Sequence, residues 1–389
     1  MMLQDYFVDL HVHIGNTMYG KPVKITASKT LTLTNILHES SKRKGLDMVG
    51  IIDGHVPAVQ EELIQLIEKG DAEPLEDGGI QYGNVTLLLG SEIEVYDDNC
   101  QGPIHVLCFF EDLYHMQQFT DWFGKRVKNI TLSSQRIYEN AHNLQKQVKE
   151  LGGVFIPAHI FTPFKSLFGK GVVASLEEIL IPELIDAVEL GLSSDTQMAD
   201  QISELHSYTF LTNSDAHSLK KIAREYQKIR MKAPTFMELK KALASKDDRG
   251  IVANYGMNPL LGKYHSTVCA NCLSPAKYGG PCEKCGHKTI IKGVSERIGE
   301  LADVRVSPKR ERPPYIHQVP LEYLPKLGPK TLEKMLSQIG TEMYILHHAT
   351  DQELAEVCSK DLIRMIKEMR EGNLSLLAGG GGKYGKVKK

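Results

Sequence analysis

The sequence has no run of about 18 consecutive apolar residues, so it predicts no membrane-spanning helix. It opens without a basic segment ahead of an apolar core, and we therefore expect no secretory signal peptide. Cysteine is scarce: the chain has seven in 389 residues, and four of them fall in two closely spaced pairs. Such pairs, without a secretory signal, are typical of metal binding in a reducing compartment rather than of disulfides, and the expected location is the cytoplasm.

The chain also has almost no net charge, −2 at pH 7, but the charges are unevenly distributed. Residues 1–258 contain 25 Lys and Arg against 34 Asp and Glu, a net charge of −9. Residues 259–389 contain 21 against 14, a net charge of +7. The basic C-terminal part indicates a surface that faces phosphate, although a charged, solvated face would give the same count.

What the chain does have is a set of His, Asp and Glu residues beside short apolar runs that read as strands. Imidazole and carboxylate suit zinc, manganese or iron, and barrel enzymes gather such ligands from several strand ends. Within a strand, residues two apart point to one face. We therefore expect a polymetal hydrolase centre built from six fragments and a weaker seventh: Asp9-Leu10-His11-Val12-His13, Asp53-Gly54-His55, Gly90-Ser91-Glu92, Pro103-Ile104-His105, Pro157-Ala158-His159, Asn213-Ser214-Asp215-Ala216-His217 and Asp186-Ala187-Val188-Glu189.

Helical patterns separate these strand-like runs. One runs from Leu31 to a stop at Gly45, a second follows Ala58, and Ser133 or Ser134 is expected to cap a helix that reaches Leu151. Strand, helix and strand repeated about seven times predict a parallel, barrel-like α/β domain. Its active site should lie at the carboxyl ends of the strands, where most of the candidate ligands fall.

These fragments resemble the motifs of the polymerase and histidinol phosphatase (PHP) superfamily over roughly residues 5–250. The resemblance implies a distorted seven-stranded (β/α) barrel that holds two or three divalent metals, with Zn, Mn or Mg as candidates. By the superfamily pattern, one metal is held by His11, His13, Glu92 and Asp215. A second is held by Glu92, His105 and His159, with Glu92 bridging. A third is served by His217 and the second motif, which here is Asp53-Gly54-His55.

The second motif departs from the superfamily pattern. The pattern has Asp directly followed by His, but here Gly54 separates Asp53 from His55. The segment Ile14-Gly15-Asn16-Thr17 also lacks a further histidine. Asp53 and His55 therefore compete for the third metal. We favour Asp53, because it occupies the Asp position of the pattern; the alternative is that its carboxylate orients a ligand imidazole.

Two cysteine pairs, each with two intervening residues, lie nine residues apart in the basic part of the chain. Four thiolates at this spacing suit a closed tetrahedral zinc site, which can organise a segment too small to build its own core. We therefore expect one structural zinc at Cys269, Cys272, Cys282 and Cys285.

A glycine-containing turn, Leu324 to Pro329, precedes an amphipathic run and resembles the hairpin of helix-hairpin-helix modules. Such a turn presents backbone N–H groups to DNA phosphate, so Lys326, Gly328 and Lys330 are expected to contact DNA. The expected organisation is a metal-dependent catalytic barrel (1–258), a zinc-binding segment (259–295), a helical DNA-binding region (296–377) and a disordered basic tail (378–389).

The whole combination resembles the endonuclease Q family, which also matches Gly262-Lys263-Tyr264-His265 and Arg312-Pro313-Pro314-Tyr315. The resemblance implies a DNA repair endonuclease that hydrolyses the phosphodiester 5′ of a deaminated base (uracil, hypoxanthine or xanthine) or at an abasic site. It implies damaged duplex or single-stranded DNA as the partner and no membrane, and leaves replication or repair proteins open as further partners.

An enzyme that reads a damaged base extrudes it into a pocket. The loop after the His159 fragment interleaves aromatic and basic residues, which suits base stacking and phosphate contact, although the phenylalanines would equally serve to close the barrel. The candidate DNA contacts of the barrel are Phe161, Phe164, Lys165, Phe168, Lys170 and Ser193.

Two other functions are compatible with parts of the sequence. A small-molecule phosphoesterase on the same barrel would explain the metal ligands but leaves residues 259–389 without a purpose. A non-catalytic DNA-binding scaffold would not need an almost complete ligand set. The endonuclease hypothesis uses both parts of the chain.

Overall fold

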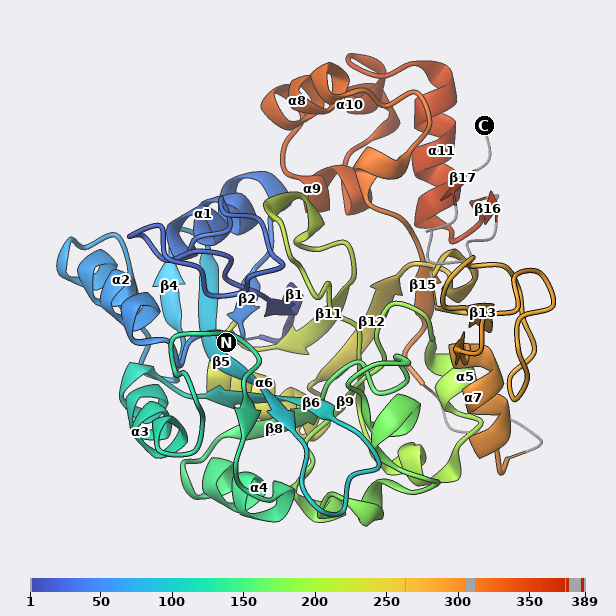
Figure 1. Ribbon diagram of the computed structural model, residues 1–389. Coiled ribbons are helices and arrows are strands. Elements are labelled where there is room, and N and C mark those ends of the chain that lie inside the picture. Colours follow the sequence, from blue (N-terminus) through green and yellow to red (C-terminus); the bar gives the residue numbers. More distant parts are fainter. Residues whose placement is uncertain (1, 263, 305–311, 375, 378–385, 388–389) are drawn as a thin grey trace.

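The computed structural model describes every residue except 1, 263, 305–311, 375, 378–385 and 388–389 (Figure 1). It confirms the predicted α/β class: a barrel in the first two thirds of the chain, with the cysteine-rich segment and a group of helices beside it (Figure 1). Over the described residues, no helix has the length and apolarity needed to cross a membrane. The expected disordered tail falls outside this part of the chain, except for Lys386–Val387, which pairs with Leu376–Leu377.

Seven strands form the barrel wall. The first three pair in parallel, and so do the last two; the fourth runs antiparallel to both of its neighbours. The Ala216 N–H donates to the His11 carbonyl and the His13 N–H donates to the Ala216 carbonyl, which brings the segment after the last strand back to the first and closes the ring. In chain order the strands are β1 (Gln4–Val12), β2 (Met48–Ile51), β5 (Val85–Val95), β6 (Ile104–Phe110), β8 (Val154–Pro157), β9 (Val188–Glu189) and β10 (Phe210–Leu211).

Strand β6 departs from the all-parallel barrel that the sequence predicts. Only residues 96–103 join β5 to β6, and no helix lies between them. A parallel neighbour needs a crossover of about a dozen residues or more, whereas an antiparallel one needs only a short loop. The short connection therefore reverses β6 and places His105 at its start rather than at its end.

Further strands extend the sheet or lie outside the barrel. Beyond β1 the order continues with β11 (Tyr226–Met231), β12 (Gly250–Gly256) and β15 (Tyr315–His317). On the other side, β4 (Ile80–Tyr82) and β3 (Glu73–Pro74) flank β5, and β7 (Arg136–Ile137) pairs with the end of β5. The cysteine-rich segment contains β13 (Val268–Cys269) and β14 (Ile290–Ile291), and β16 (Leu376–Leu377) and β17 (Lys386–Val387) lie near the C-terminus.

The helices cover the outside of the barrel or gather in the C-terminal part (Figure 1). Those of the barrel are α1 (Leu33–His38), α2 (Pro57–Glu68), α3 (Leu113–Gly124), α4 (Ala141–Glu150), α5 (Thr196–Ala199) and α6 (Phe236–Leu243). Those that follow are α7 (Val294–Leu301), α8 (Pro329–Gln338), α9 (Glu342–His347), α10 (Asp351–Ala355) and α11 (Lys360–Arg370). The expected helix start at Ser133 or Ser134 is wrong: α4 begins at Ala141 and is capped by Asn140.

Successive side chains of each strand point to opposite faces, which divides the core in two. One buried cluster fills the barrel and takes every second strand residue; the other lies under the outer helices. In β5, Leu88 belongs to the inner cluster and Leu87 and Leu89 to the outer one. Gly50 and Gly90 make room for the inner Phe109, since a Cβ on either would lie within 3.0 Å of its ring. The candidate ligands Glu92 and His105 continue the inner faces of their strands toward the open end of the barrel.

A β-bulge turns two histidines of β1 toward the same open end. Val8 and Leu10 point into the barrel. Between Asp9 and Val12, β1 advances three residues while β2 advances two, from Val49 to Ile51. The extra residue switches the inward face from even to odd positions, so that His11 and His13 face inward.

The C-terminal helices pack on the barrel beside β1 and β11. Lys44, at the end of the π-helical turn η1 (Glu39–Lys44), donates to Glu342 of α9 at 2.9 Å, and both side chains are buried. In α9, His347 stacks on Phe7 at a centroid distance of 4.5 Å. Its Nε2 accepts a 2.7 Å hydrogen bond from Tyr226, whose hydroxyl accepts in turn from Gln318. A buried polar network therefore joins these helices to the barrel wall.

Candidate metal centre

Three groups of side chains that could each hold a metal ion meet at the open end of the barrel. In each group, one possible ligand atom per residue lies within 4.8 Å of the others. The groups are His11, His13 and Glu92; Glu92, His105 and His159; and His13, Asp215 and His217. Strand ends far apart in the sequence therefore bring together the residues that the fragments singled out.

Glu92 lies at the middle of the centre and is almost fully buried. Its Oε1 is 2.8 Å from His105 Nδ1, 3.4 Å from His159 Nε2 and 3.5 Å from His11 Nε2. Its Oε2 is 3.6 Å from His13 Nε2. A carboxylate with imidazoles around both oxygens has the position that a bridging ligand requires.

Asp215 closes the centre from the opposite wall. One oxygen, Oδ1, lies 3.5 Å from His11 Nε2, 3.4 Å from His13 Nε2 and 3.5 Å from His217 Nδ1. Asp215 and His159 have positive φ angles, 46° and 32°, which non-glycine residues rarely adopt. Such backbone costs roughly 1–3 kcal/mol per residue and persists where the surrounding structure enforces it, as at a binding site.

The donor set fits divalent metals. His11 Nε2 and His13 Nε2, which point at Glu92 and Asp215, are buried and make no hydrogen bond, and neither does the buried His105 Nε2. An unsatisfied buried polar atom costs about 1–3 kcal/mol, so an array of them calls for a ligand. Histidine nitrogens converging with two carboxylates match the ligand preference of zinc or manganese.

The charges of the cluster favour ionised carboxylates. Burial by itself raises the pKa of Glu92, but the charges of His105 and Lys24 hold it well below its usual range. Burial likewise opposes ionisation of Asp215, and His11 and His13 lower its pKa well below the ordinary value. Burial lowers the pKa of His217 to about 4, which keeps its imidazole neutral. Burial opposes the charged form of His11, but Glu189 and Asp215 raise its pKa well above the usual value. Ionised carboxylate and neutral imidazole are the forms that bind metal, so a metal bound by His11 would displace a proton.

The two residues of the second motif occupy different places. Asp53 Oδ2 accepts from the backbone N–H of Ile14 at 2.7 Å and lies 3.3 Å from His13 Nδ1, behind that imidazole. His55 uses Nδ1 toward Ser91 at 2.8 Å and Nε2 toward the Leu132 carbonyl at 3.3 Å. Both ring nitrogens of His55 are therefore engaged away from the centre. The position of Asp53 favours the alternative role, orientation of a ligand imidazole.

Sequence reasoning missed Lys24 and two serines of the centre and gave Glu189 only as part of the weakest fragment. Lys24 Nζ lies 3.3 Å from Glu92 Oε2 and donates to Ser134 at 2.6 Å. Ser134 also donates to Glu92, and Ser133 lies 3.1 Å from His13 Nδ1. Glu189, which ended the weakest fragment, contacts His11 Nδ1 through both oxygens at 3.0 and 3.1 Å. For Lys24 and the serines, no local pattern marks the loops that carry them.

A cavity of about 470 Å³ opens beside the centre. Of the residues expected to contact DNA, Phe164, Lys165 and Ser193 line it. Phe164 is 48% exposed and packs edge-on against Tyr264 at a centroid distance of 5.5 Å. Four basic residues also line the cavity: Lys24, Lys165, Lys221 and Arg224. An aromatic rim over basic walls suits a nucleotide.

The expectation that Phe161 and Phe168 contact DNA is wrong. Both rings are buried, at 1% and 0% exposure, and stack on each other at 5.5 Å. They close the core below the loop, which is the alternative that the sequence left open. Lys170 is exposed and lies outside the cavity, against Gly102.

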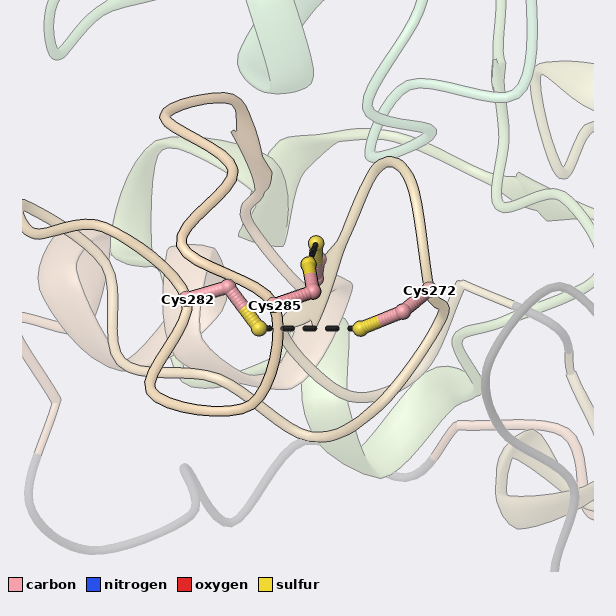
Figure 2. Close-up of side chains that lie close together, drawn as sticks. Cys272, Cys282 and Cys285 are labelled. Atoms are coloured by element: carbon pink, nitrogen blue, oxygen red, sulfur yellow. Dashed lines mark hydrogen bonds between the residues drawn. The ribbon is translucent and has the colours of Figure 1, made fainter.

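The four cysteines form a second, separate cluster. Figure 2 labels three of them, Cys272, Cys282 and Cys285. Cys269 Sγ is 3.5 Å from Cys285 Sγ, and Cys272 Sγ is 3.6 Å from Cys282 Sγ. Tetrahedral zinc with bonds of about 2.3 Å places its sulfurs about 3.8 Å apart, close to these distances. A hydrogen bond from the Ser274 backbone lowers the pKa of the Cys272 thiol to about 6. The cluster therefore fits the expected zinc.

The residues of the predicted hairpin lie on the surface of the C-terminal helices. Gly328 is exposed and occupies the N-cap of α8. Lys330 is exposed in the first turn, and Lys326, at φ 69°, pairs with Asp361 at 2.7 Å. Their positions leave them accessible to a nucleic acid backbone.

Similar proteins extend over the entire chain. An uncharacterised protein of Bacillus subtilis, YqxK, is 53% identical over 387 residues, which is 99% of this chain and 100% of the relative. The lesion-specific endonuclease PfuEndoQ of Pyrococcus furiosus has a crystal structure that is 31% identical, with a TM-score of 0.83 over 99% of this chain and 95% of that one. Endonuclease Q bound to a 27-mer duplex substrate with an abasic lesion at its active site is 30% identical, with a TM-score of 0.83 over 99% and 96%. No protein-family model matches the chain.

Proposed function

The chain belongs to the endonuclease Q family, and we propose that it is a metal-dependent DNA repair endonuclease that cuts a strand at a damaged nucleotide. One observation carries this proposal. The metal-ligating side chains converge beside a basic, aromatic-rimmed cavity in a chain that matches a lesion-specific endonuclease over 99% of its length.

For the barrel we propose two metals that share Glu92. His11, His13 and Asp215 complete the first site, and His105 and His159 complete the second. His217, beside Asp215, would serve a third. Divalent metals bound there would activate a water for in-line attack on phosphorus and stabilise the leaving oxygen. In the same cavity, Lys24 and Arg224 are placed to hold the charged phosphate.

The substrate we propose is DNA with a deaminated base or an abasic site, cleaved 5′ of the lesion. The cavity has the size of a small-molecule site, so one extruded nucleotide can enter it. Phe164 and Tyr264 stand at its rim, where an aromatic pair can stack against a base. A mispaired or missing base is the easiest to extrude, which favours lesions over intact DNA.

The zinc cluster would hold Tyr264 in place from outside the barrel. The backbone N–H of Val294 donates to the Tyr264 carbonyl at 2.9 Å, and β13, which contains Cys269, pairs with β14, which follows Cys285. Metal binding organises so short a segment, so its zinc is structural. The thiols it requires stay reduced in a cytoplasmic compartment, which is the location we propose.

The test is cleavage of end-labelled duplexes that carry one abasic site, one uracil, one hypoxanthine or no lesion. The matched proteins are the wild type, the double variant His11→Ala/Asp215→Ala and the control His142→Ala, which changes an exposed histidine of α4. We expect a nick 5′ of each lesion from the wild type and the control, and none from the double variant or in EDTA.

Two results would contradict the proposal. Equal cutting of damaged and undamaged duplexes would remove lesion recognition. Hydrolysis of a phosphomonoester without any nick, under each of Zn, Mn and Mg, would assign the centre to small-molecule phosphoester chemistry instead.

A further inference from the structure

A short stretch of the acidic barrel carries only positive charge. Residues 124–138 contain Lys125, Arg126, Lys128 and Arg136 and no Asp or Glu, although residues 1–258 as a whole have a net charge of −9. The stretch runs from the end of α3 to β7. A local excess of this kind in an acidic domain marks a surface for an anionic partner.

Two of these cations stack on exposed tyrosines. The guanidinium of Arg136 lies 4.7 Å from the ring centre of Tyr96 and 5.6 Å from that of Tyr138. Lys128 Nζ lies 5.6 Å from the ring centre of Tyr138 on the same surface. The two tyrosines are 38% and 52% exposed, and both cations are exposed. We call these four residues the tyrosine–arginine surface.

The surface is held in place by the backbone beneath it. β7 pairs with the end of β5 and brings Arg136 beside Tyr96, where its Nη2 donates to the Tyr96 carbonyl at 2.6 Å. The backbone N–H of Tyr138 donates to the Arg126 carbonyl at 2.7 Å. Arg126 in turn bonds the Trp122 carbonyl and Glu139. Such fixed rings and cations lose little conformational freedom when they bind a ligand.

The two carboxylates directly next to the tyrosines in sequence are already engaged. Glu139, next to Tyr138, pairs with Arg126 at 3.2 Å. Asp97, next to Tyr96, accepts from the backbone N–H of Ala141 at 2.9 Å. Among the described residues, neither Lys128 nor Arg136 forms an ion pair, so the charge of both is available to a partner.

The same segments connect this surface with the metal centre. Strand β5 carries Glu92 and ends at Val95, directly before Tyr96; four residues of extended chain span about 13 Å. The loop that ends in Arg136 also supplies Ser133 and Ser134, which contact His13 and Glu92. A distance of about 13 Å corresponds to about four stacked nucleotides of one strand.

We propose that Tyr96, Lys128, Arg136 and Tyr138 bind unpaired nucleotides of the DNA strand a few positions from the lesion. The inference rests on the proposed function. Phosphate alone would need only the two cations, whereas two exposed rings interleaved with them form a stacking platform for bases. Extrusion of the damaged nucleotide interrupts the base stack at the lesion, and the platform would hold nucleotides of the same strand that open beside it while the cut is made.

The test measures single-turnover cleavage of a duplex with one tetrahydrofuran abasic analogue while the enzyme is titrated. The variants are Tyr96→Leu/Tyr138→Leu and Arg136→Gln. The matched controls are Tyr114→Leu, a 63% exposed tyrosine on α3, and Lys146→Gln, an exposed lysine on α4. Unchanged metal content and melting temperature show that the fold is retained.

For the double tyrosine variant we expect the half-saturating enzyme concentration to rise about fivefold or more, with the maximal rate within about twofold of wild type. For Arg136→Gln we expect the slope of log affinity against log salt to fall by about one, because one phosphate contact is lost. The nucleotides that bind the surface lie on one side of the lesion. On a duplex shortened on that side these nucleotides are missing, so the double tyrosine variant should then have the same half-saturating concentration as the wild type.

The outcomes separate this proposal from the proposed function. In one outcome, the wild type cuts the lesion duplex and the variants match it in half-saturating concentration and salt slope on every duplex. That outcome overturns the role of the tyrosine–arginine surface but leaves the proposed function intact. Wild-type protein that cuts no lesion duplex overturns the proposed function. A variant defect that persists on duplexes shortened on either side overturns binding of neighbouring nucleotides.

Discussion

Glu189 contacts the His11 ring on the side that faces away from the metal centre. Its Nδ1 lies 3.0 and 3.1 Å from the two carboxylate oxygens, while its Nε2 points to Glu92 and Asp215. Glu189 itself accepts from Asn213 and from the backbone N–H of His159. One buried carboxylate therefore fixes the ring of one candidate ligand and the backbone of another, and sets the tautomer that leaves Nε2 free for a metal.

Replacement of Glu189 by Gln should weaken metal binding while the fold is kept. The amide retains the shape of the side chain but removes the charge that favours Nδ1–H and strengthens His11 as a ligand. We expect a loss of metal affinity of about 10- to 100-fold and cleavage that returns with excess metal. Metal titration of cleavage checks this against Glu183→Gln, an exposed control. Wild-type metal dependence would remove Glu189 from the centre.

Lys24→Met should slow cleavage without removing metal. Lys24 is 16% exposed in its side chain, pairs with Glu92 and lines the cavity, so it is placed to contact the reacting phosphate. Removal of one such charged donor should lower the maximal rate by about 10²-fold or more. The control is Lys69→Met, at the exposed end of α2. A normal rate, or a loss of metal equal to the loss of rate, would contradict this role.

Phe164→Ala should impair cleavage of damaged DNA and spare the metals. The ring is half exposed and its main partner is Tyr264, so truncation removes one wall of the rim rather than a core residue. Loss of one stacking contact should weaken lesion binding by about 1–3 kcal/mol. Binding to an abasic duplex is measured beside Val173→Ala, a 62% exposed residue of the same loop. Unchanged binding would exclude the ring from recognition.

Cys272→Ser should cost the protein one zinc and leave the barrel folded. The four thiolates hold a segment with only two short strands, so loss of one ligand should expose residues 266–292 to protease. Zinc content and limited proteolysis are compared with Cys358→Ser, a free cysteine outside the cluster. Retention of all zinc in Cys272→Ser would contradict the assignment.

His347 should make the protein less stable in acid. Burial, with Lys228 nearby, lowers its pKa to about 3, whereas the unfolded chain has the usual value of about 6.5. Because the unfolded state takes up the proton first, this contribution to stability is complete above pH ~6.5. It is lost as pH falls toward 3, by at most about 1.4 kcal/mol per pH unit.

Urea unfolding between neutral and acid pH checks the effect of His347. His347→Phe keeps a ring on Phe7 but cannot be protonated, so its free energy of unfolding should fall less steeply with acid than that of the wild type. His142→Ala, at an exposed histidine, should follow the wild type. Parallel curves for all three proteins would show that His347 is protonated equally in both states.

Part of the centre could be predicted because strand geometry is local. Apolar runs with alternating faces place Glu92 and His105 inside the barrel, and His11 and His13 two residues apart share a face whatever the remainder of the fold. The bulge that turns those histidines inward leaves no mark in the sequence, since it depends on how β1 pairs with β2. The fragments therefore predict that the candidate ligands converge, but they do not predict the bulge by which β1 turns its histidines inward.

Other features depend on contacts between distant segments. Lys24 and Ser134 reach Glu92 from loops 110 residues apart, so no window of sequence contains the contact. Phe161 and Phe164 share one loop and the same residue type, yet the first is buried and the second exposed. Burial at that scale is decided by the packing of neighbouring loops, which composition does not encode. The reversed β6 was readable in principle, from the short connection before it.

The buried bond between Lys44 and Glu342 bears on how the protein can be divided. A shortened gene that ends before α9 would remove both the counter-charge of Lys44 and the helix that covers its ammonium group. It would also uncover Phe7, Tyr226 and Tyr255, which now pack around His347. Such a fragment should aggregate during expression. The two parts of the chain should therefore be produced and engineered as one unit, with insertions confined to exposed loops.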